Sequence, residues 1–226
     1  MGDLSRKSGL LYSEKERNEL RVELLFITPD AEKLIETVGR TSYLSFDKQG
    51  ENTEKEFIRM LLKMGHYSVL EHAYAAFRIA GVSRAFTHQL IRHRLCSFTQ
   101  QSQRYVDESN FNYVEPASIK DNSKAHPLFT KFMGEARRIY SELQRLGIRN
   151  EDARFVLPNA VESQIVVTAN LREWRHIIGL RGNPDAQWEI REVAIEVLKI
   201  LQKYAPTVFE DFEIDEQGGI MKRTEI

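Results

Sequence analysis

Helical and strand-like segments follow one another in this chain without the regular alternation that a parallel sheet requires. Alternating or continuous apolar runs predict strands at 21–27, 73–79 and 163–169. Apolar residues at helical spacing predict helices at 30–38, 51–64, 83–92, 128–146, 150–158, 170–182 and 185–204. We therefore predict an α+β fold, with a mixed or antiparallel sheet flanked by long helices.

Capping residues set the limits of several of these helices. Ser83 and Asn170 are expected as N-caps because their side-chain oxygens can accept from the first free amides of a helix. Gly65 and Gly147 are expected to end the helices that precede them, because glycine readily adopts the left-handed conformation found there. Trp174 and Trp188 lie at apolar helix positions and are expected in the core.

Length and composition indicate a soluble cytoplasmic protein. No apolar run approaches the roughly 20 residues that cross a bilayer, and the N-terminus is polar. The single cysteine, Cys96, excludes an intrachain disulfide framework and suits a reducing compartment. We expect residues 1–226 to form one domain, with residues 1–20 as a flexible N-terminal extension.

One stretch departs from the near-neutral net charge of −1. Residues 72–106 contain no Asp, Glu or Lys, and their cations are all arginine: Arg78, Arg84, Arg92, Arg94 and Arg104. A solvated charged surface normally mixes both signs and uses lysine freely. Arginine without acidic partners indicates multidentate recognition of phosphate or another anion, and this points to a nucleotide ligand.

The triplet Arg92-His93-Arg94 is the centre of this stretch. If the helix continues through it, Arg92 and Arg94 point in different directions and address two neighbouring ligands, or one that wraps around the helix end. Gln89 would share the face of Arg92 and could read a base edge. The apolar-free run at 100–104 is expected to be a loop whose amides, hydroxyl and guanidinium hold a phosphate.

Other kinds of site receive less support. Cys96 falls four residues after Arg92, but a lone helical cysteine is more often a packed residue than a nucleophile. The histidine pairs at 66 and 72 and at 88 and 93 lack a matching set of ligands, so we expect no metal. Neither a dinucleotide-binding G-x-G-x-x-G nor a phosphate-binding G-x4-G-K-[ST] is present.

Five segments give the chain a resemblance to a known family. Arg92-His93-Arg94 followed after seven residues by Ser102 is similar to the signature of flavin-dependent thymidylate synthases. The family's other motifs are matched in order by GHYSVLEH (65–72), DARFVLP (152–158), NLREWRHIIGLR (170–181) and DAQWEIR (185–191). The resemblance implies reductive methylation of dUMP to dTMP with FAD, NADPH and methylenetetrahydrofolate. It also implies no protein nucleophile, and a homotetramer with active sites shared between subunits.

The resemblance also implies roles for individual residues. Arg181 would be catalytic, favouring the ionised pyrimidine, and Arg154 would reach the nucleotide of a neighbouring subunit. The dUMP-binding positions would be Gln89, Arg92, Gln100, Gln101, Ser102, Gln103, Arg104, Arg154 and Arg181. The FAD-binding positions would be Ser68, Glu71, Arg92, His93, Arg94, Gln100, Asn170, Arg172 and His176.

Two positions depart from the family pattern. Gln100 stands where the family usually has Glu, so a carboxylate role is absent there. Gln103 stands where Gly is frequent, which disfavours a close approach of backbone to ligand. On the helix at 170–182, Arg172 and His176 share a face, and Arg181 is expected on roughly the opposite side.

Two alternative functions remain open from the sequence. The arginine-rich stretch, with Phe98 and Tyr105 for stacking, could serve a nucleic-acid binding module, although the chain is net acidic. A flavoprotein reductase or oxidase without methyl transfer would use the same cofactors, and its nicotinamide oxidation would be indifferent to dUMP.

Overall fold

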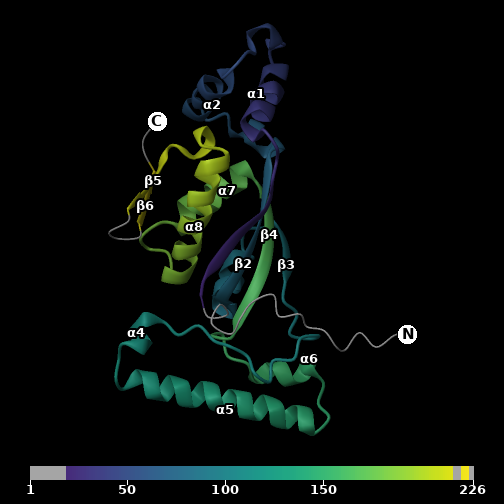
Figure 1. Ribbon diagram of the computed structural model, residues 1–226, viewed down its shortest axis with the longest axis vertical. Helices are drawn as coiled ribbons and strands as arrows, with labels where there is room; N and C mark the ends of the chain where they lie inside the picture. The colour runs from purple at the N-terminus through teal and green to yellow at the C-terminus, as the bar shows by residue number, and fades with distance from the viewer. Residues whose placement is uncertain (1–18, 216–219, 224–226) are drawn as a thin grey trace, which may run out of the picture.

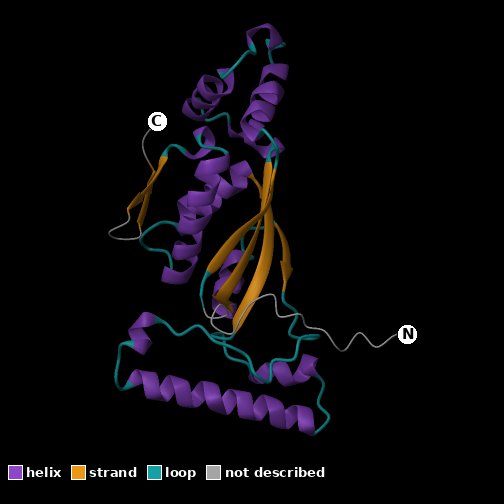
Figure 2. Cartoon of the chain, viewed as in Figure 1, coloured by secondary structure: helices purple, strands orange, loops and turns teal. Residues whose placement is uncertain are grey.

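A four-stranded antiparallel sheet forms the centre of the computed structural model, which describes residues 19–215 and 220–223 (Figures 1 and 2). The strand order is β1-β2-β4-β3. The strands are β1 (Arg21–Ile27), β2 (Tyr74–Ser83), β4 (Glu162–Asn170) and β3 (Ser97–Gln100). All three pairings are antiparallel, so the predicted α+β class is confirmed. The 18 residues before Glu19, which hold most of the predicted N-terminal extension, lie outside the described residues.

Two long helices pack on one face of this sheet. α7 (Leu171–Arg181) and α8 (Trp188–Tyr204) run beside it in Figure 1. The inward-facing residues of β2 and β4, including Phe77 and Val167, are buried beneath them. Trp174 is buried against Phe77 with ring centroids 5.0 Å apart, and its indole N–H donates to the Ala75 carbonyl at 3.1 Å. This layer fixes α7, which carries several of the expected site residues.

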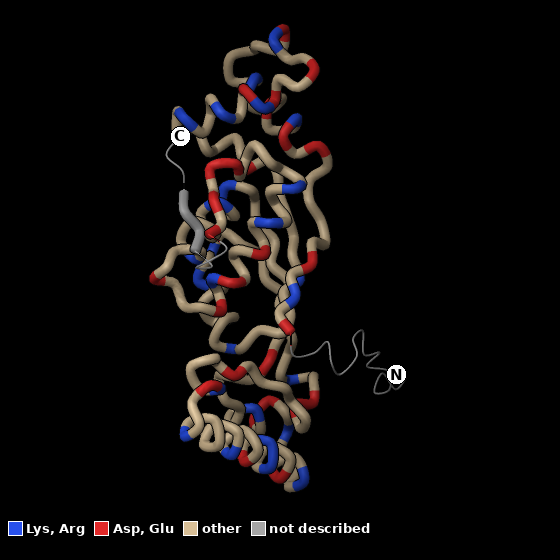
Figure 3. Tube along the Cα trace, turned by 60° about the vertical axis from the view of Figure 1, so that its left-hand side comes forward, with Lys and Arg blue, Asp and Glu red and all other residues tan. Residues whose placement is uncertain are grey.

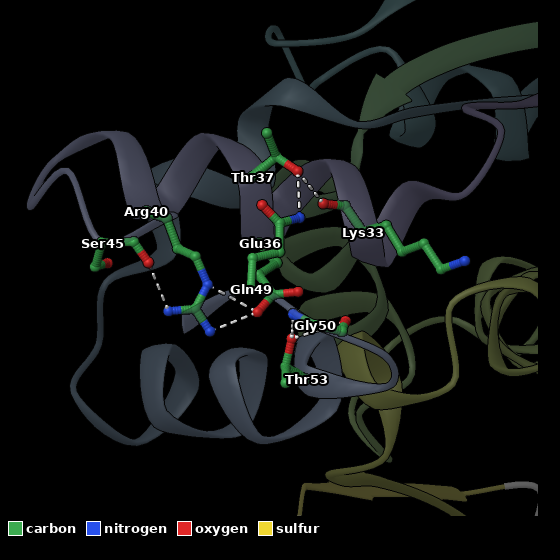
Figure 4. A network of polar contacts seen from close by, with 8 residues as sticks. All are labelled: Lys33, Glu36, Thr37, Arg40, Ser45, Gln49, Gly50 and Thr53. Atoms are coloured by element: carbon green, nitrogen blue, oxygen red, sulfur yellow. Dashed lines mark hydrogen bonds and ion pairs between the residues drawn. The ribbon is translucent and has the colours of Figure 1, made fainter. Parts of the chain in front are cut away.

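A helical pair lies at one end of the sheet, at the top of Figure 1. It consists of α1 (Ala31–Thr41) and α2 (Thr53–Lys63), with the 3-10 segments η2 (Phe46–Lys48) and η3 (Tyr67–His72). Figure 4 shows the polar network around α1, where Arg40 donates through Nε and Nη2 to Glu36 at 2.9 and 2.6 Å. Both side chains are buried, and Arg40 also donates to the Ser45 carbonyl. This network holds the α1–α2 connection against the end of α1.

A second helical layer lies at the opposite end of the sheet. It contains α4 (Ala117–Lys120), the long α5 (Ala125–Arg145), α6 (Asn150–Ala153) and η4 (Arg154–Val156). A small separate cluster supports it, formed by Phe111, Met133, Ala136 and Val161. At the C-terminus, η5 (Thr207–Phe209) leads to a hairpin of β5 (Phe212–Asp215) and β6 (Ile220–Arg223). The buried Asp211 beside it pairs with Arg175 of α7.

Helix ends agree with the sequence at four positions and differ at the start of the final helix. Gly65 and Gly147 follow the ends of α2 and α5 with φ values of +71° and +82°, as predicted. The Ser83 hydroxyl accepts from the Phe86 amide at 3.0 Å, and the Asn170 side chain accepts from the Glu173 amide at 2.8 Å, as predicted. The final helix starts at Trp188 instead of near Asp185, because Gln187 caps it through its side chain. Trp188 itself is 38% exposed, so its predicted core position was wrong.

The helix predicted through Arg92 ends earlier. α3 (Arg84–Leu90) stops two residues before Arg92, because the amides of Arg92 and His93 bond to carbonyls three residues back and tighten the chain into a turn. The strand β3 then follows, with Gln100 as its last residue. Arg92, His93 and Arg94 therefore lie on a connection between a helix and a strand, and no shared helical direction constrains them. Within the described part of the chain, no helix is long and apolar enough to cross a membrane.

Gly81 gives a test of this fold. Its φ is +74°, and a methyl group there would lie 2.1 Å from the Glu19 carbonyl oxygen. We expect Gly81→Ala to lower the free energy of unfolding by at least about 2 kcal/mol, measured by urea denaturation, because strain and clash add. Gly134→Ala is the matched control, since open space surrounds that exposed helical glycine; it should raise stability by about 0.5–1 kcal/mol. Equal stability of the two variants would contradict this account.

Candidate active site

A buried carboxylate fixes the start of α3. Glu189 of α8 accepts from the Ser83 amide and the Ser83 hydroxyl, both at 2.6 Å. Burial raises the pKa of Glu189, and the two Ser83 hydrogen bonds oppose that rise. Because Ser83 also caps α3, the same contact ties α8, the end of β2 and α3 together. The position of Gln89, in the last turn of α3, follows from it.

The turn after α3 presents two arginines to solvent and one histidine to the interior. Arg92 and Arg94 are exposed, and neither guanidinium has a hydrogen bond or ion pair with any of the residues that the structure describes. His93, between them, is only 5% exposed. The turn therefore directs cations outward and an imidazole inward, an arrangement suited to binding an anionic ligand at the surface.

His93 connects the turn to α7. The Arg181 Nε–H donates to His93 Nε2 at 2.9 Å, and the His176 ring lies edge-on to the His93 ring with centroids 5.6 Å apart. His93 Nδ1 faces the Glu173 carboxylate at 3.5 Å. Burial, with the positive charges of Arg181 and His176, lowers the pKa of His93 to about 4. The imidazole is therefore neutral at physiological pH. His93 also joins His176 and Arg181, which the sequence had placed on opposite sides of α7.

A cavity of about 440 Å³ opens beside this contact. It is lined by Ala85, His88, Gln89, Arg92, Asn159 and Arg181. Burial and the neighbouring Arg92 lower the pKa of Arg181, but a guanidinium stays charged at any physiological pH. The cavity thus offers two guanidiniums and two amides to one ligand. Three of the residues expected to bind dUMP (Gln89, Arg92 and Arg181) come together in it.

A second group of expected residues surrounds the start of α7. Ser68 and Glu71 lie on η3, and the Glu71 carboxylate pairs with Arg172. Asn170 caps α7 with its side-chain oxygen, so that oxygen is already used by the fold. His176 is exposed on the next turn. These residues lie on two adjoining elements next to His93, which makes a continuous polar surface from η3 to the turn.

The residues of the run 100–104 are held by the protein itself. The Gln100 amide donates to Thr87 at 2.9 Å and to Ser163 at 3.2 Å, and the Gln101 amide donates to the buried Glu108 at 3.0 Å. The Ser102 hydroxyl accepts from the Arg104 amide at 3.3 Å, and Gln103 lies in the same turn. None of these residues lines the cavity described above.

Arg104 and Arg154 meet at α6. Arg104 forms an ion pair with Glu151 at 2.7 Å, so the expectation that it lacks an acidic partner was wrong. Arg154 is exposed and donates to the Glu151 carbonyl at 3.1 Å. Arg78, another arginine of the acid-free stretch, also has an acidic partner, since it pairs with Glu23 on the neighbouring strand at 3.1 Å. Distance along the chain concealed both acids, since they approach only when the sheet and α6 form.

Sequence reasoning missed three residues that contribute to these contacts. Glu173 and Glu108 are buried carboxylates facing His93 and Gln101, and Asn159 lines the cavity. Arg84 is half-buried, and burial together with nearby Arg154 lowers its pKa. For Glu173 a signal existed, because it sits beside two expected FAD residues on α7, but nothing in the sequence indicated that it would face His93.

Two chemical alternatives can be judged from the geometry. His93, Glu173 and His176 bring ligand atoms within 4.8 Å of one another, as a metal site would. A metal ion there would lie among Arg172, Arg181 and Arg92, whose charges oppose a cation. Cys96 is outside any helix, and burial raises the pKa of its thiol to about 12, so it holds almost no thiolate.

A cavity lined by guanidiniums and amides suits an anionic ligand with hydrogen-bonding edges. Residues 23–207 match the family model described as thymidylate synthase complementing protein. The flavin-dependent thymidylate synthase of Corynebacterium glutamicum is 44% identical over 202 residues, covering 82% of this chain and 81% of that protein. That of Pyrococcus abyssi is 49% identical over 163 residues, covering 70% and 67%.

A solved structure has the same fold. Thymidylate synthase X from Helicobacter pylori, crystallised with FAD and dUMP, superposes with a TM-score of 0.72 over 85% of this chain and 98% of its own, at 23% identity. The chain belongs to the family of the thymidylate synthase complementing proteins, the flavin-dependent thymidylate synthases. The resemblance drawn from the motifs is confirmed.

The neutral state of His93 predicts a pH dependence of stability. Between pH 6.5 and about 4 the unfolded chain takes up a proton at this residue and the folded chain does not, so stability falls as the pH falls. We expect this residue to contribute a loss of up to about 3 kcal/mol by pH 4 and none above pH 6.5. Urea denaturation at pH 7.5 and 4.5 should show a smaller difference for His93→Gln than for the wild type. His66→Gln, at an exposed histidine, should behave as the wild type does; equal pH dependence in all three proteins would contradict this account.

Proposed function

We propose that this protein methylates dUMP to dTMP in the cytoplasm. It would use methylenetetrahydrofolate as the carbon donor, FAD as the bound cofactor and NADPH as the reductant. The observation that carries the proposal is the cavity in which Arg181, Arg92 and Gln89 meet. Gln89 can pair with a base edge, and the two guanidiniums can bind an anion.

Arg181 has a catalytic role in this proposal. Its Nε–H donates to His93 and its Nη2 donates to the Gln89 carbonyl at 3.5 Å, which leaves Nη1 for a ligand in the cavity. A fixed guanidinium beside the pyrimidine stabilises negative charge that develops on the ring during attack. Because the group is already oriented, little reorganisation is needed when that charge appears. No protein nucleophile is required, in line with the high pKa of Cys96.

The residues present fit FAD. The exposed guanidiniums of Arg92 and Arg94 have no side-chain partner among the described residues, and a pyrophosphate needs such donors. Arg172, Asn170 and His176 extend the polar surface along α7. Ser68 and Glu71 adjoin it from η3, and Gln100 is proposed as a further contact. Bound FAD would supply the hydride chemistry, while these residues bind and orient it.

The phosphate of dUMP would bind across subunits. The turn with Gln101, Ser102 and Gln103 offers backbone amides and a hydroxyl, and Arg104 follows it. Arg154 is exposed beside Phe155, which is 85% exposed, on a surface apart from the cavity. A homotetramer in which Arg154 reaches a neighbour's nucleotide would give both residues a partner.

Two other functions receive less support. Figure 3 shows positive and negative residues interspersed along the trace, whereas a nucleic-acid binding surface concentrates positive charge on one face. A reductase without methyl transfer would need no guanidinium and amide at the cavity beside the flavin residues. Dependence of nicotinamide oxidation on dUMP separates that reading from a synthase.

The first experiment measures flavin binding and dTMP formation in one preparation. We expect the purified protein to retain FAD, its visible spectrum to shift when dUMP is added, and dTMP to form only with NADPH and methylenetetrahydrofolate. Arg181→Ala should keep the flavin and lose dTMP formation by about 10²-fold or more, as when an electrostatic stabiliser is removed. Arg78→Ala is the control, since Arg78 pairs with Glu23 outside the site. Wild-type turnover in Arg181→Ala would remove its catalytic role, and no retained flavin would remove the proposed function.

Shared active sites can be tested by co-expression. Arg154→Ala and Arg181→Ala should each be inactive alone, because each lacks one residue of every site. Mixed tetramers contain some sites with both arginines intact, so co-expression should restore roughly a quarter of wild-type activity if assembly is random. Activity that stays absent in mixed tetramers of confirmed composition would show that Arg154 and Arg181 act within one subunit.

A further inference from the structure

Three neighbouring polar side chains, those of Glu173, His93 and Arg181, lead from the buried side of α7 to the cavity. Glu173 Oε1 lies 3.5 Å from His93 Nδ1, and His93 Nε2 accepts from Arg181 Nε–H at 2.9 Å. Glu173 and Arg181 lie in the first and last turns of α7, and His93 comes from the turn after α3. Of these three residues, only Glu173 has no role in the proposed reaction.

The contact with Arg181 determines the protonation of His93. A guanidinium can only donate, so His93 Nε2 must carry a lone pair. His93 is neutral at physiological pH, so its one ring proton lies on Nδ1. The nearest carboxylate oxygen to Nδ1 is Glu173 Oε1, at 3.5 Å. If the proton moved to Nε2, it would face the Arg181 N–H and the contact would become repulsive.

Glu173 is placed to prevent that change of tautomer. It is 6% exposed, and its carboxylate has no hydrogen bond from the other residues that the structure describes. Burial raises its pKa, while the positive charges of His176 and Arg172 oppose that rise. A buried carboxylate without another donor attracts the nearest N–H dipole, which is His93 Nδ1–H. Carboxylates orient imidazoles in the same way behind metals and catalytic bases.

We propose that Glu173 is a positioning residue, which fixes His93 as the Nδ1–H tautomer and through it holds the Arg181 guanidinium at the edge of the cavity. This role rests on the proposed function, since Arg181 is taken to act on the pyrimidine. The same geometry explains why His93, Glu173 and His176 need not hold a metal. His93 Nε2 is occupied by Arg181, and Nδ1 carries a proton.

The test compares two substitutions at Glu173 that differ in one property. Glu173→Leu removes the acceptor, whereas Glu173→Gln keeps an oxygen that can accept from His93 Nδ1–H. Glu36→Gln is the control, because Glu36 is also a buried carboxylate, pairs with Arg40 on α1 and does not line the cavity. All are made in the full-length chain, and flavin content and assembly are measured first.

The direct readout is solid-state NMR of protein labelled with 15N-histidine. The His93 signals are assigned as those that are missing from the spectrum of the His93→Gln variant. We expect the wild type and Glu36→Gln to show a protonated Nδ1 and an unprotonated Nε2. Glu173→Leu should lose this preference, and Glu173→Gln should keep it with a shifted Nδ1 resonance. An unchanged tautomer in Glu173→Leu, or an unshifted resonance in Glu173→Gln, would overturn the proposal.

Steady-state kinetics give the second readout. Glu173→Leu should lower kcat about tenfold, equivalent to about 1.4 kcal/mol, while the KM for dUMP stays within about twofold. Glu173→Gln should lose less than about threefold in kcat, because the contact survives. Equal losses in the two variants with the His93 tautomer intact would overturn the proposal. The NMR result is independent of turnover. A wild type that forms no dTMP would refute the proposed function, and the spectra alone would then decide whether Glu173 sets the His93 tautomer.

Discussion

The buried contact between Glu189 and Ser83 sets the position of the whole site. One carboxylate accepts from both the backbone and the hydroxyl of Ser83, and that hydroxyl in turn caps α3. Gln89 lies in α3, and the turn with Arg92 and Arg94 follows α3 directly. The distance from these residues to α7 therefore depends on the contact between Ser83 and Glu189 of α8. The two helices that cover the sheet therefore hold both sides of the cavity, one through Ser83 and the other through Arg181.

Arginine serves two purposes in the acid-free stretch. Arg78 and Arg104 pair with acids from distant segments, whereas Arg92 and Arg94 have no such partner among the described residues. The residue type was the same in every case, so composition predicted an anion site but could not separate its members from arginines in structural ion pairs. The separation depends on which strand or helix passes nearby, and that is a property of the tertiary structure.

The fold was predictable where local chemistry determines it, and the site only in part. The apolar patterns of β1, β2 and β4 and the caps Ser83 and Asn170 are local signals, and the structure has them. The short polar strand β3 gave no such local signal, because the strand forms only through its pairing with β4. The family motifs assigned Arg92 and Arg181 to the same ligand. The hydrogen bond from Arg181 Nε–H to His93 Nε2 was not predictable, because it joins two residues 88 positions apart in the sequence.

The unpaired guanidiniums of Arg92 and Arg94 also affect how long the protein survives. Like charges near each other destabilise the folded state, and a bound anion removes that repulsion. A ligand that binds only the folded form adds RT ln(1 + [L]/Kd) to stability, about 2.7 kcal/mol at a hundred times its Kd. Because proteases act on the unfolded population, an anion bound at these two guanidiniums would lengthen the lifetime of the protein.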